Sequence, residues 1–300
     1  MTRIARTVLA QWAPTMVQPW DDLVAQAGEG GVTDLVRLLR PVCAAANGLT
    51  PLPVPPGEAV VAASHSAVVE FAEQFCVDVS SIDDAQRARL HAAVGDAMGD
   101  VVAATWVADM VPRVAHTLAR LFPDTEAPAD APAGSEEITW RTRGNLVGDV
   151  VKRVTPTVGA LKEVDPVTTE VVRLRGAAAH NCRLCKSLRD TTALEAGADS
   201  SVLEQLATDP RAAAALDAPH RAAVALVDAI VWAPAHLSDE VIADLRRHYT
   251  AAEQVEMVLD VARNGVNKIM VALGRDEARV DEGVEFYHVG DDGIPVFADA

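Results

Sequence analysis

Aromatic residues and cysteines are both scarce in this chain. Only 4% of its 300 residues are Phe, Trp or Tyr although 50% are hydrophobic, so small aliphatic residues must supply the core. Such a core suits closely packed helices better than an aromatic-rich β-sandwich. Four cysteines are too few for the disulfide framework of a secreted protein. We therefore expect an all-α protein whose thiols are reduced by default.

Basic charge is also in short supply. The chain has 26 Lys and Arg against 43 Asp and Glu, a net charge of −17, which argues against nucleic acid and against an anionic membrane as partners. It contains no run of about 18 uncharged apolar residues, as a membrane span would need. The basic N-terminus has only a short apolar run, broken by Gln11, and does not resemble a signal peptide. We predict a cytoplasmic protein.

Segments without helical periodicity divide the chain. Residues 123–137, PDTEAPADAPAGSEE, are rich in Pro, Ala and acid and predict a linker. This linker separates an N-terminal helical half, residues 1–122, from a second helical domain, residues 138–274. In the tail, residues 275–300, the sequence EFYHVGDDGIPVF predicts a short β-hairpin.

Two helix starts are marked clearly in the second domain. Asp165 followed by Pro166 is typical of an N-cap with proline at the first helical position. Thr250 and Glu253 have the spacing of a capping box. Both signals support the helical interpretation of residues 138–274.

The two halves resemble each other weakly at an offset of 155 residues. The matching residues are mostly apolar, and unrelated amphipathic helices would give some of them by chance. They are Ile82, Asp84, Ala88, Leu90, Val111, Val114 and Leu118, against Leu237, Asp239, Ala243, Leu245, Val266, Ile269 and Leu273. The pattern leaves open two tandem, degenerate helical halves, of which the first carries no CxxC motif.

Two cysteines, Cys182 and Cys185, form a CxxC pair within the segment HNCRLCKSLRD. A structural zinc site usually needs a second such pair, which the sequence lacks, and two inert core cysteines are a further alternative. The redox interpretation is favoured because this spacing lets the two sulfurs meet. If Asn181 caps a helix that runs through Arg189, Cys182 lies in its first turn, where unpaired N–H groups stabilise a thiolate.

Positive charge surrounds the pair. Five basic residues and no acid lie between Arg173 and Arg189, in a chain that is acidic elsewhere. A solvated basic face would have the same composition. On a continuous helix, however, Arg189 shares a face with Cys185, and a guanidinium there lowers the pKa of the thiol. Asn264 and Asn267 share one side of a later helix and are candidates to line the thiol pocket.

Glu170 precedes Cys182 by twelve residues, and Cys185 completes the motif. With this spacing, residues 165–274 resemble the all-helical carboxymuconolactone decarboxylase-like, or alkylhydroperoxidase D-like (AhpD-like), family. The resemblance implies an AhpD-like helical bundle that forms homo-oligomers. It also implies a thiol peroxidase or disulfide reductase in which Cys185 attacks, Cys182 resolves and Glu170 belongs to a proton relay. The helix argument alone favours Cys182 as the attacking thiol, so the roles stay open.

Two relay positions differ from the family pattern. Peroxidases of the family carry histidines where this chain has Leu184, between the cysteines, and Arg189, four residues after the second. Arginine cannot shuttle a proton at neutral pH, although it can hold a thiolate as a fixed charge. His180 is the candidate replacement in acid–base catalysis. The chain must also turn near His180, because a continuous helix would separate Glu170 from Cys182 by about 18 Å.

The leading hypothesis is an AhpD-like thiol oxidoreductase. The candidate site residues are Cys182, Cys185, Glu170, Arg189 and His180. The chemistry requires no bound cofactor or metal, and the substrate would be a hydroperoxide or a partner disulfide. The resemblance implies electron supply from a lipoyl-bearing or peroxiredoxin protein. Two alternatives are a non-catalytic oligomerisation module of the same fold and a decarboxylase or lyase that acts on an anionic substrate.

Overall fold

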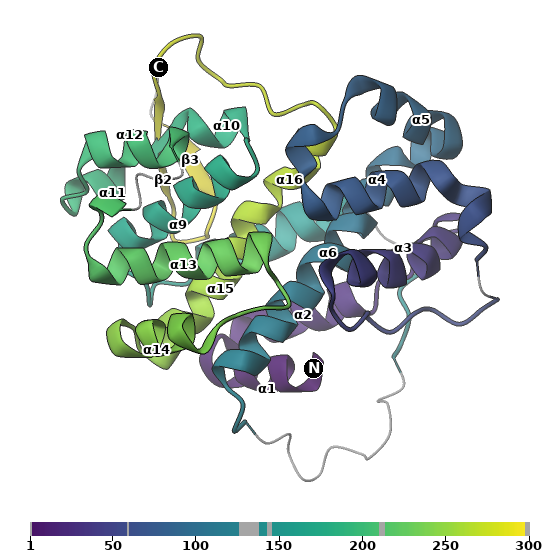
Figure 1. The fold of residues 1–300 in the computed structure, drawn as a ribbon, viewed down its shortest axis with the longest axis horizontal. Helices are drawn as coiled ribbons and strands as arrows, with labels where there is room; N and C mark the ends of the chain where they lie inside the picture. Colours follow the sequence, from purple (N-terminus) through teal and green to yellow (C-terminus); the bar gives the residue numbers. More distant parts are fainter. Residues whose placement is uncertain (1, 59, 126–137, 143–145, 210–213, 298–300) are drawn as a thin grey trace. The chain divides into compact units, whose positions relative to one another are not determined.

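The computed structural model describes residues 2–58, 60–125, 138–142, 146–209 and 214–297 (Figure 1). The chain divides into two compact units, Met1–Val154 and Thr155–Ala300. Regular structure among the described residues is mostly helical, as predicted, and one small sheet lies in the second unit. None of the helices in this part of the chain is long and apolar enough to cross a bilayer.

Seven α-helices build the first unit. They are α1 (Thr2–Trp12), α2 (Val17–Val24), α3 (Val32–Asn47), α4 (Ser66–Val77), α5 (Asp84–Val94), α6 (Met98–Leu121) and α7 (Leu146–Asp149). Helix α6 is the central one, because it is buried along most of its length and packs against α1 and α3. Helix α3 also packs against α4. Short 3-10 turns connect these helices at Pro14–Met16, Ala62–His65, Val79–Ser81 and Gly95–Ala97.

The first unit extends further along the chain than the predicted linker. Helix α7 packs against α6, and the π-helical turn Val150–Val154 packs against α2. These contacts assign residues up to Val154 to the first unit, so the second begins at Thr155 and not at residue 138. Residues 126–137 of the predicted linker lie outside the described residues.

The second unit is organised around α9. Its helices are α8 (Thr155–Gly159), α9 (Pro166–Ala179), α10 (Arg183–Lys186), α11 (Thr191–Glu195), α12 (Ser200–Thr208), α13 (Ala218–Trp232), α14 (Asp239–His248), α15 (Ala251–Gly265) and α16 (Asn267–Ala272). Helix α9 packs against α12, α13 and α15. The predicted helix starts are confirmed: Asp165 accepts from the N–H groups of Val167 and Thr168, and Thr250 and Glu253 form a complete capping box.

A three-stranded sheet completes the second unit. The predicted hairpin is confirmed as β2 (Glu285–Val289) antiparallel to β3 (Pro295–Phe297). A third strand, β1 (Leu188–Asp190), was not predicted and pairs parallel to β2. The hairpin turn packs on α8 through Gly293, whose φ is +76° and where a Cβ atom would fall 1.8 Å from the Pro156 carbonyl oxygen. Only glycine fits there, so this close approach fixes the hairpin against α8.

The two units share an order of helix packing. Helix α9 packs against α13 and α15 as α3 packs against α4 and α6. Helix α14 begins 155 residues after α5 (239 − 84), and α13 ends 155 residues after α4 (232 − 77). The offset that was visible in the sequence is therefore also the offset between corresponding helices.

Candidate functional site

The CxxC segment follows a sharp reversal of the chain. Helix α9 ends at Ala179, and Asn181 has a φ of +50°, the one positive value among non-glycine residues in the described chain. The Cys182 N–H then bonds to the Ala177 carbonyl at 3.0 Å. The predicted turn near His180 is thus present, and it lets α9 and the CxxC segment lie side by side.

The predicted helix through the cysteines is wrong in its start and its length. Cys182, and not Asn181, is the N-cap of α10, and its Sγ accepts the Cys185 N–H at 3.2 Å. Helix α10 ends at Lys186, after which the chain enters β1. Pairing of β1 with β2 supplies hydrogen bonds that continued helix would have lacked in competition with the sheet, so Arg189 lies on a strand.

A side chain from beyond α16 fixes the start of α10. The Asp276 carboxylate accepts the Arg183 N–H at 2.9 Å and pairs with its guanidinium at 3.0 Å, while the Asp276 carbonyl accepts the Leu184 N–H at 2.8 Å. The pKa of Asp276 is lowered, because its hydrogen bonds and the Arg183 charge outweigh the cost of desolvation. The two cysteines are therefore held on a short turn that is anchored at both ends.

The two sulfurs lie at disulfide distance, with Cα atoms 5.3 Å apart. Cys182 is 1% exposed and Cys185 is 6% exposed. Cys185 also lines a pocket of about 210 Å³, whose walls all come from the second unit. Of the two sulfur-bearing residues, Cys185 is therefore the one that a small molecule can reach.

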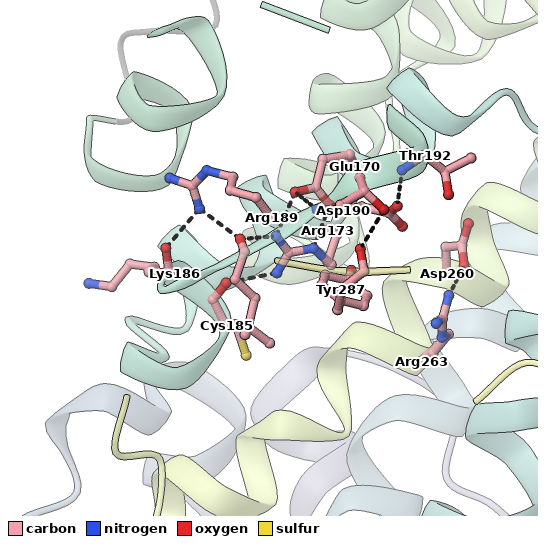
Figure 2. Close-up of polar contacts among 12 residues, drawn as sticks. Glu170, Arg173, Cys185, Lys186, Arg189, Asp190, Thr192, Asp260, Arg263 and Tyr287 are labelled. Atoms are coloured by element: carbon pink, nitrogen blue, oxygen red, sulfur yellow. Dashed lines mark hydrogen bonds and ion pairs between the residues drawn. The ribbon is translucent and has the colours of Figure 1, made fainter. Parts of the chain in front are cut away.

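Glu170 and Arg173 lock the CxxC segment to α9 (Figure 2). Arg173 donates to both carboxylate oxygens of Glu170 at 2.6 and 2.7 Å, and to the carbonyl oxygens of Cys185 and Leu188 at 2.7 Å each. Burial by itself would lower the pKa of Arg173, but the Glu170 carboxylate raises it above the usual value. Arg173 is thus a fixed positive charge whose hydrogen bonds hold the backbone of the cysteine segment.

Arg189, the arginine expected beside the thiol, points elsewhere. Its guanidinium donates to the carbonyl oxygens of Lys186 and Leu188, on the side away from the Cys185 sulfur (Figure 2). Desolvation and the nearby charge of Arg173 lower its pKa. The structure brings Glu170 and Arg173 together with Cys185, and it gives Arg189 a role in binding backbone.

His180 is buried at the C-cap of α9, where its N–H bonds to the Gly176 carbonyl at 3.0 Å. Its place in the fold is at the chain reversal itself. Pocket-lining residues come instead from α9, α10, α15, α16 and the hairpin.

The far wall of the pocket combines a helix junction with the hairpin. Asn264 and Asn267 line it, as the sequence predicted. Arg263, beside them on α15, and Tyr287, on β2, were missed. The spacing of Glu170 and Arg173, three residues apart, was a signal for their ion pair, whereas no local pattern marks Arg263 or Tyr287. Burial raises the pKa of Tyr287, so its hydroxyl stays protonated.

Two buried acids lie on α15 behind this wall. Burial raises the pKa of Glu256 to about 7 and the pKa of Asp260 to about 6. Glu256 accepts the Glu163 N–H at 2.7 Å, and Asp260 is paired with Arg263 at 3.6 Å. No group of three or more His, Cys, Asp or Glu in the described part of the chain could hold a metal ion.

Comparison with known proteins gives the chain its relatives. No family model and no solved structure matches the sequence. Two proteins of Mycobacterium tuberculosis, "Uncharacterized protein MT2376" of strain CDC 1551 / Oshkosh and "Uncharacterized protein Rv2313c" of strain ATCC 25618 / H37Rv, are 40% identical to it over 297 residues. The matches cover 95% of this chain and 99% of each relative. This chain belongs to their family. The similarity spans both units, so it is not confined to the CxxC segment.

Proposed function

We propose that this protein is an AhpD-like thiol oxidoreductase, in which Cys182 and Cys185 exchange two electrons with a hydroperoxide or a partner disulfide. One observation carries the proposal: Cys185 lines a pocket while its sulfur lies at disulfide distance from that of Cys182. A structural disulfide or a pair of inert core thiols has no need of a pocket at one sulfur.

The geometry supports different roles for the two sulfurs. Cys185 faces the pocket, so it is the sulfur that meets an incoming peroxide, disulfide or donor thiol. When a donor thiolate attacks Cys185, Cys182 leaves as a thiolate, and the Cys185 N–H at its Sγ stabilises that negative charge. We therefore assign attack to Cys185 and resolution to Cys182, which agrees with the roles that the family resemblance implies.

In the peroxide reaction, the Cys185 thiolate attacks the terminal oxygen of the hydroperoxide. The O–O bond breaks, Cys185 becomes a sulfenic acid, and the alkoxide takes a proton to leave as an alcohol. Cys182 then attacks the Cys185 sulfur, so that the disulfide forms and water leaves. An external dithiol, such as the lipoyl or peroxiredoxin partner that the resemblance implies, returns two electrons by thiol–disulfide exchange.

Arg173, and not Arg189, supplies the fixed charge near the attacking sulfur in this proposal. Glu170 is committed to Arg173 through both of its carboxylate oxygens. We therefore assign Glu170 to positioning Arg173, in place of the proton relay expected from the resemblance. A cytoplasmic homo-oligomer remains part of the proposal.

Thiol counting by mass spectrometry tests the proposal. We expect peroxide to remove two alkylatable thiols, those of Cys182 and Cys185, while Cys43 and Cys76 stay reduced because both are buried and unpaired by disulfide. In a Cys182→Ser variant, Cys185 should form a stable mixed disulfide with a small aromatic disulfide. A Cys185→Ser variant should form this adduct at least tenfold more slowly at Cys182.

A Cys43→Ala/Cys76→Ala variant is the matched control and should behave as the wild type. Two thiols that stay alkylatable at Cys182 and Cys185 after peroxide treatment would exclude the oxidoreductase and favour the oligomerisation module. Turnover of an anionic substrate that survives the Cys182→Ser/Cys185→Ser double change would favour the decarboxylase alternative.

A further inference from the structure

The pocket beside Cys185 is small and mostly lined by hydrocarbon. Its volume of about 210 Å³ is below the usual range of about 300–1,000 Å³ for drug-sized ligands. Ala177, Leu184, Leu188, Tyr287 and Phe297 supply its apolar lining. These dimensions suit an apolar or aromatic group of modest size.

Two arginines also line the pocket, and they differ in what they have left to offer. Arg173 already donates to Glu170, Cys185 and Leu188 through four hydrogen bonds, so it cannot bind a ligand without releasing its own segment. Arg263 has a single ion pair among the described residues, with Asp260 at 3.6 Å. A guanidinium has five N–H donors in a planar fork, so Arg263 keeps donors for a ligand.

Both partners of this ion pair are incompletely bonded. Asp260 is 2% exposed, and its Oδ2 atom has no hydrogen-bond partner in the described structure. The Arg263 guanidinium lies against Gly159, where a Cβ atom would be 3.1 Å from Cζ. Backbone on one side and Asp260 on another therefore hold the guanidinium in place at the pocket wall (Figure 2).

Two amides extend this polar patch. Asn264 and Asn267 line the pocket next to Arg263, and the only hydrogen bond of their side chains in the described structure runs from Asn267 Nδ2 to the Asn264 carbonyl at 3.3 Å. The pocket thus has one polar wall with a single positive charge and amide donors, facing apolar walls and one sulfur.

We propose that this pocket binds a small apolar or aromatic monocarboxylate, with its carboxylate on Arg263 and Asn264 and its apolar body against Leu184, Tyr287 and Phe297. A planar guanidinium with unused donors matches a carboxylate in two parallel hydrogen bonds. As a statement about the substrate, this inference deepens the proposed function and rests on it. The binding itself does not require the cysteines to react.

Calorimetric titration of the full-length Cys182→Ser/Cys185→Ser protein with phenylacetate tests the inference without redox chemistry. Phenylacetamide, which has the same shape and no charge, should bind at least tenfold more weakly. Arg263→Gln should weaken phenylacetate binding at least tenfold, and Arg263→Lys should weaken it less, because the charge remains and the planar fork is lost. Arg247→Gln, an exposed arginine of α14 paired with Asp244, is the control and should change nothing.

Asp260→Asn gives a result that a purely structural role for Arg263 would not. Because Asp260 competes with the ligand for the guanidinium, its neutral variant should bind phenylacetate at least threefold more tightly. Equal binding of acid and amide, unchanged affinity in Arg263→Gln, or weaker binding in Asp260→Asn would overturn the inference. Carboxylate binding in a protein whose wild type never oxidises at Cys182 and Cys185 would instead overturn the proposed function alone.

Discussion

Each of the two units buries an arginine that pairs with an acid on its own helix and donates to the carbonyl of a cysteine. In the first unit, Arg113 bonds to Asp109 at 2.8 Å and to the Cys76 carbonyl at 2.8 Å. In the second, Arg173 bonds to Glu170 and to the Cys185 carbonyl at 2.7 Å. The same polar arrangement therefore serves both cores.

The cysteines around these arginines differ completely. Cys43 and Cys76 lie on separate helices, α3 and α4, and both are buried with free thiols. Cys182 and Cys185 lie on one turn, and Cys185 opens onto a pocket. The comparison teaches that a buried ion pair beside a cysteine is a packing device. Reactivity needs the chain reversal that brings two sulfurs together at a pocket.

Arg113→Met should have the largest effect on stability. Asp109 is fully buried and would keep its charge without the arginine, although Asn47 still donates to it at 2.8 Å. Breaking a buried pair in this way costs about 3–5 kcal/mol. Urea denaturation followed by circular dichroism measures the loss, and thiol exchange at Cys185 should not change under native conditions.

The triple change Asn47→Leu/Asp109→Leu/Arg113→Met removes the whole network and is the control. It should recover at least half of the lost stability, because no unpaired buried charge remains. A loss below about 1 kcal/mol in Arg113→Met would show that the first unit tolerates an unpaired Asp109, and the parallel with the second unit would not hold.

Arg173→Met should combine a somewhat smaller loss of stability with a loss of reactivity. Glu170 is 1% exposed, but the Arg173 side chain is 12% exposed, so water can compensate part of the charge. We expect the free energy of unfolding to fall by about 3 kcal/mol. The carbonyls of Cys185 and Leu188 also lose their donor, so the mixed-disulfide reaction at Cys185 should slow by about tenfold, given that charge-assisted bonds are each worth about 1.5–3 kcal/mol.

The reaction of Cys185 with a small aromatic disulfide, followed by stopped flow, measures this effect. Glu170→Gln retains the shape of the side chain and is the matched control for loss of charge alone. Unchanged reactivity in Arg173→Met, with stability lost, would make the second pair a packing device like the first.

Local signals in the sequence were sufficient for the helices and for the turn that brings Glu170 to the cysteine segment. Asp165 with Pro166 marked the start of α9, and the Thr250 capping box marked α15. Such signals depend on hydrogen bonds within a few residues, which the sequence carries directly. The hairpin was predicted for the same reason.

The errors at the site come from contacts between distant segments. Leu188, Arg189 and Asp190 pair with Glu285, Phe286 and Tyr287, and this pairing ends α10 and turns Arg189 away from the thiol. Tertiary pairing overrode a helical pattern that was reasonable locally. Arg263 and Tyr287 reach the pocket through the packing of α15 and the hairpin on α9, which spacing in the sequence does not encode.

Glu256→Gln should separate the units by pH dependence. Among the described acids, those whose pKa is raised are Glu256 and Asp260, both in the second unit. The pKa of Glu256 rises from 4.5 to about 7 in the fold, so its favourable contribution is complete below pH 4.5 and is lost as the pH rises through 7. The amide removes that penalty, and the free energy of unfolding should rise by about 2 kcal/mol at pH 8, allowing for solvent screening.

Near pH 4.5 the same change should have little effect, because Glu256 is then protonated in both states. Asp260 titrates in the variant as in the wild type, so the difference between the two proteins isolates Glu256. Urea denaturation of both at pH 5 and pH 8 is the measurement. A stability difference that does not depend on pH would place Glu256 in contact with water.

Arg189→Gln should have the smallest effect on reactivity, and it tests the correction made at the site. The guanidinium bonds to the carbonyls of Lys186 and Leu188, so its loss weakens backbone packing by about 1 kcal/mol while relieving repulsion with Arg173. The rate of mixed-disulfide formation at Cys185 should stay within about twofold of the wild type, since a charge that does not face the sulfur changes its pKa little. Arg173→Gln, measured beside it, should slow the same reaction about tenfold, as expected for Arg173→Met. A tenfold loss in Arg189→Gln would return this arginine to the thiol site, and the second unit would then depend on two fixed charges where the first has one.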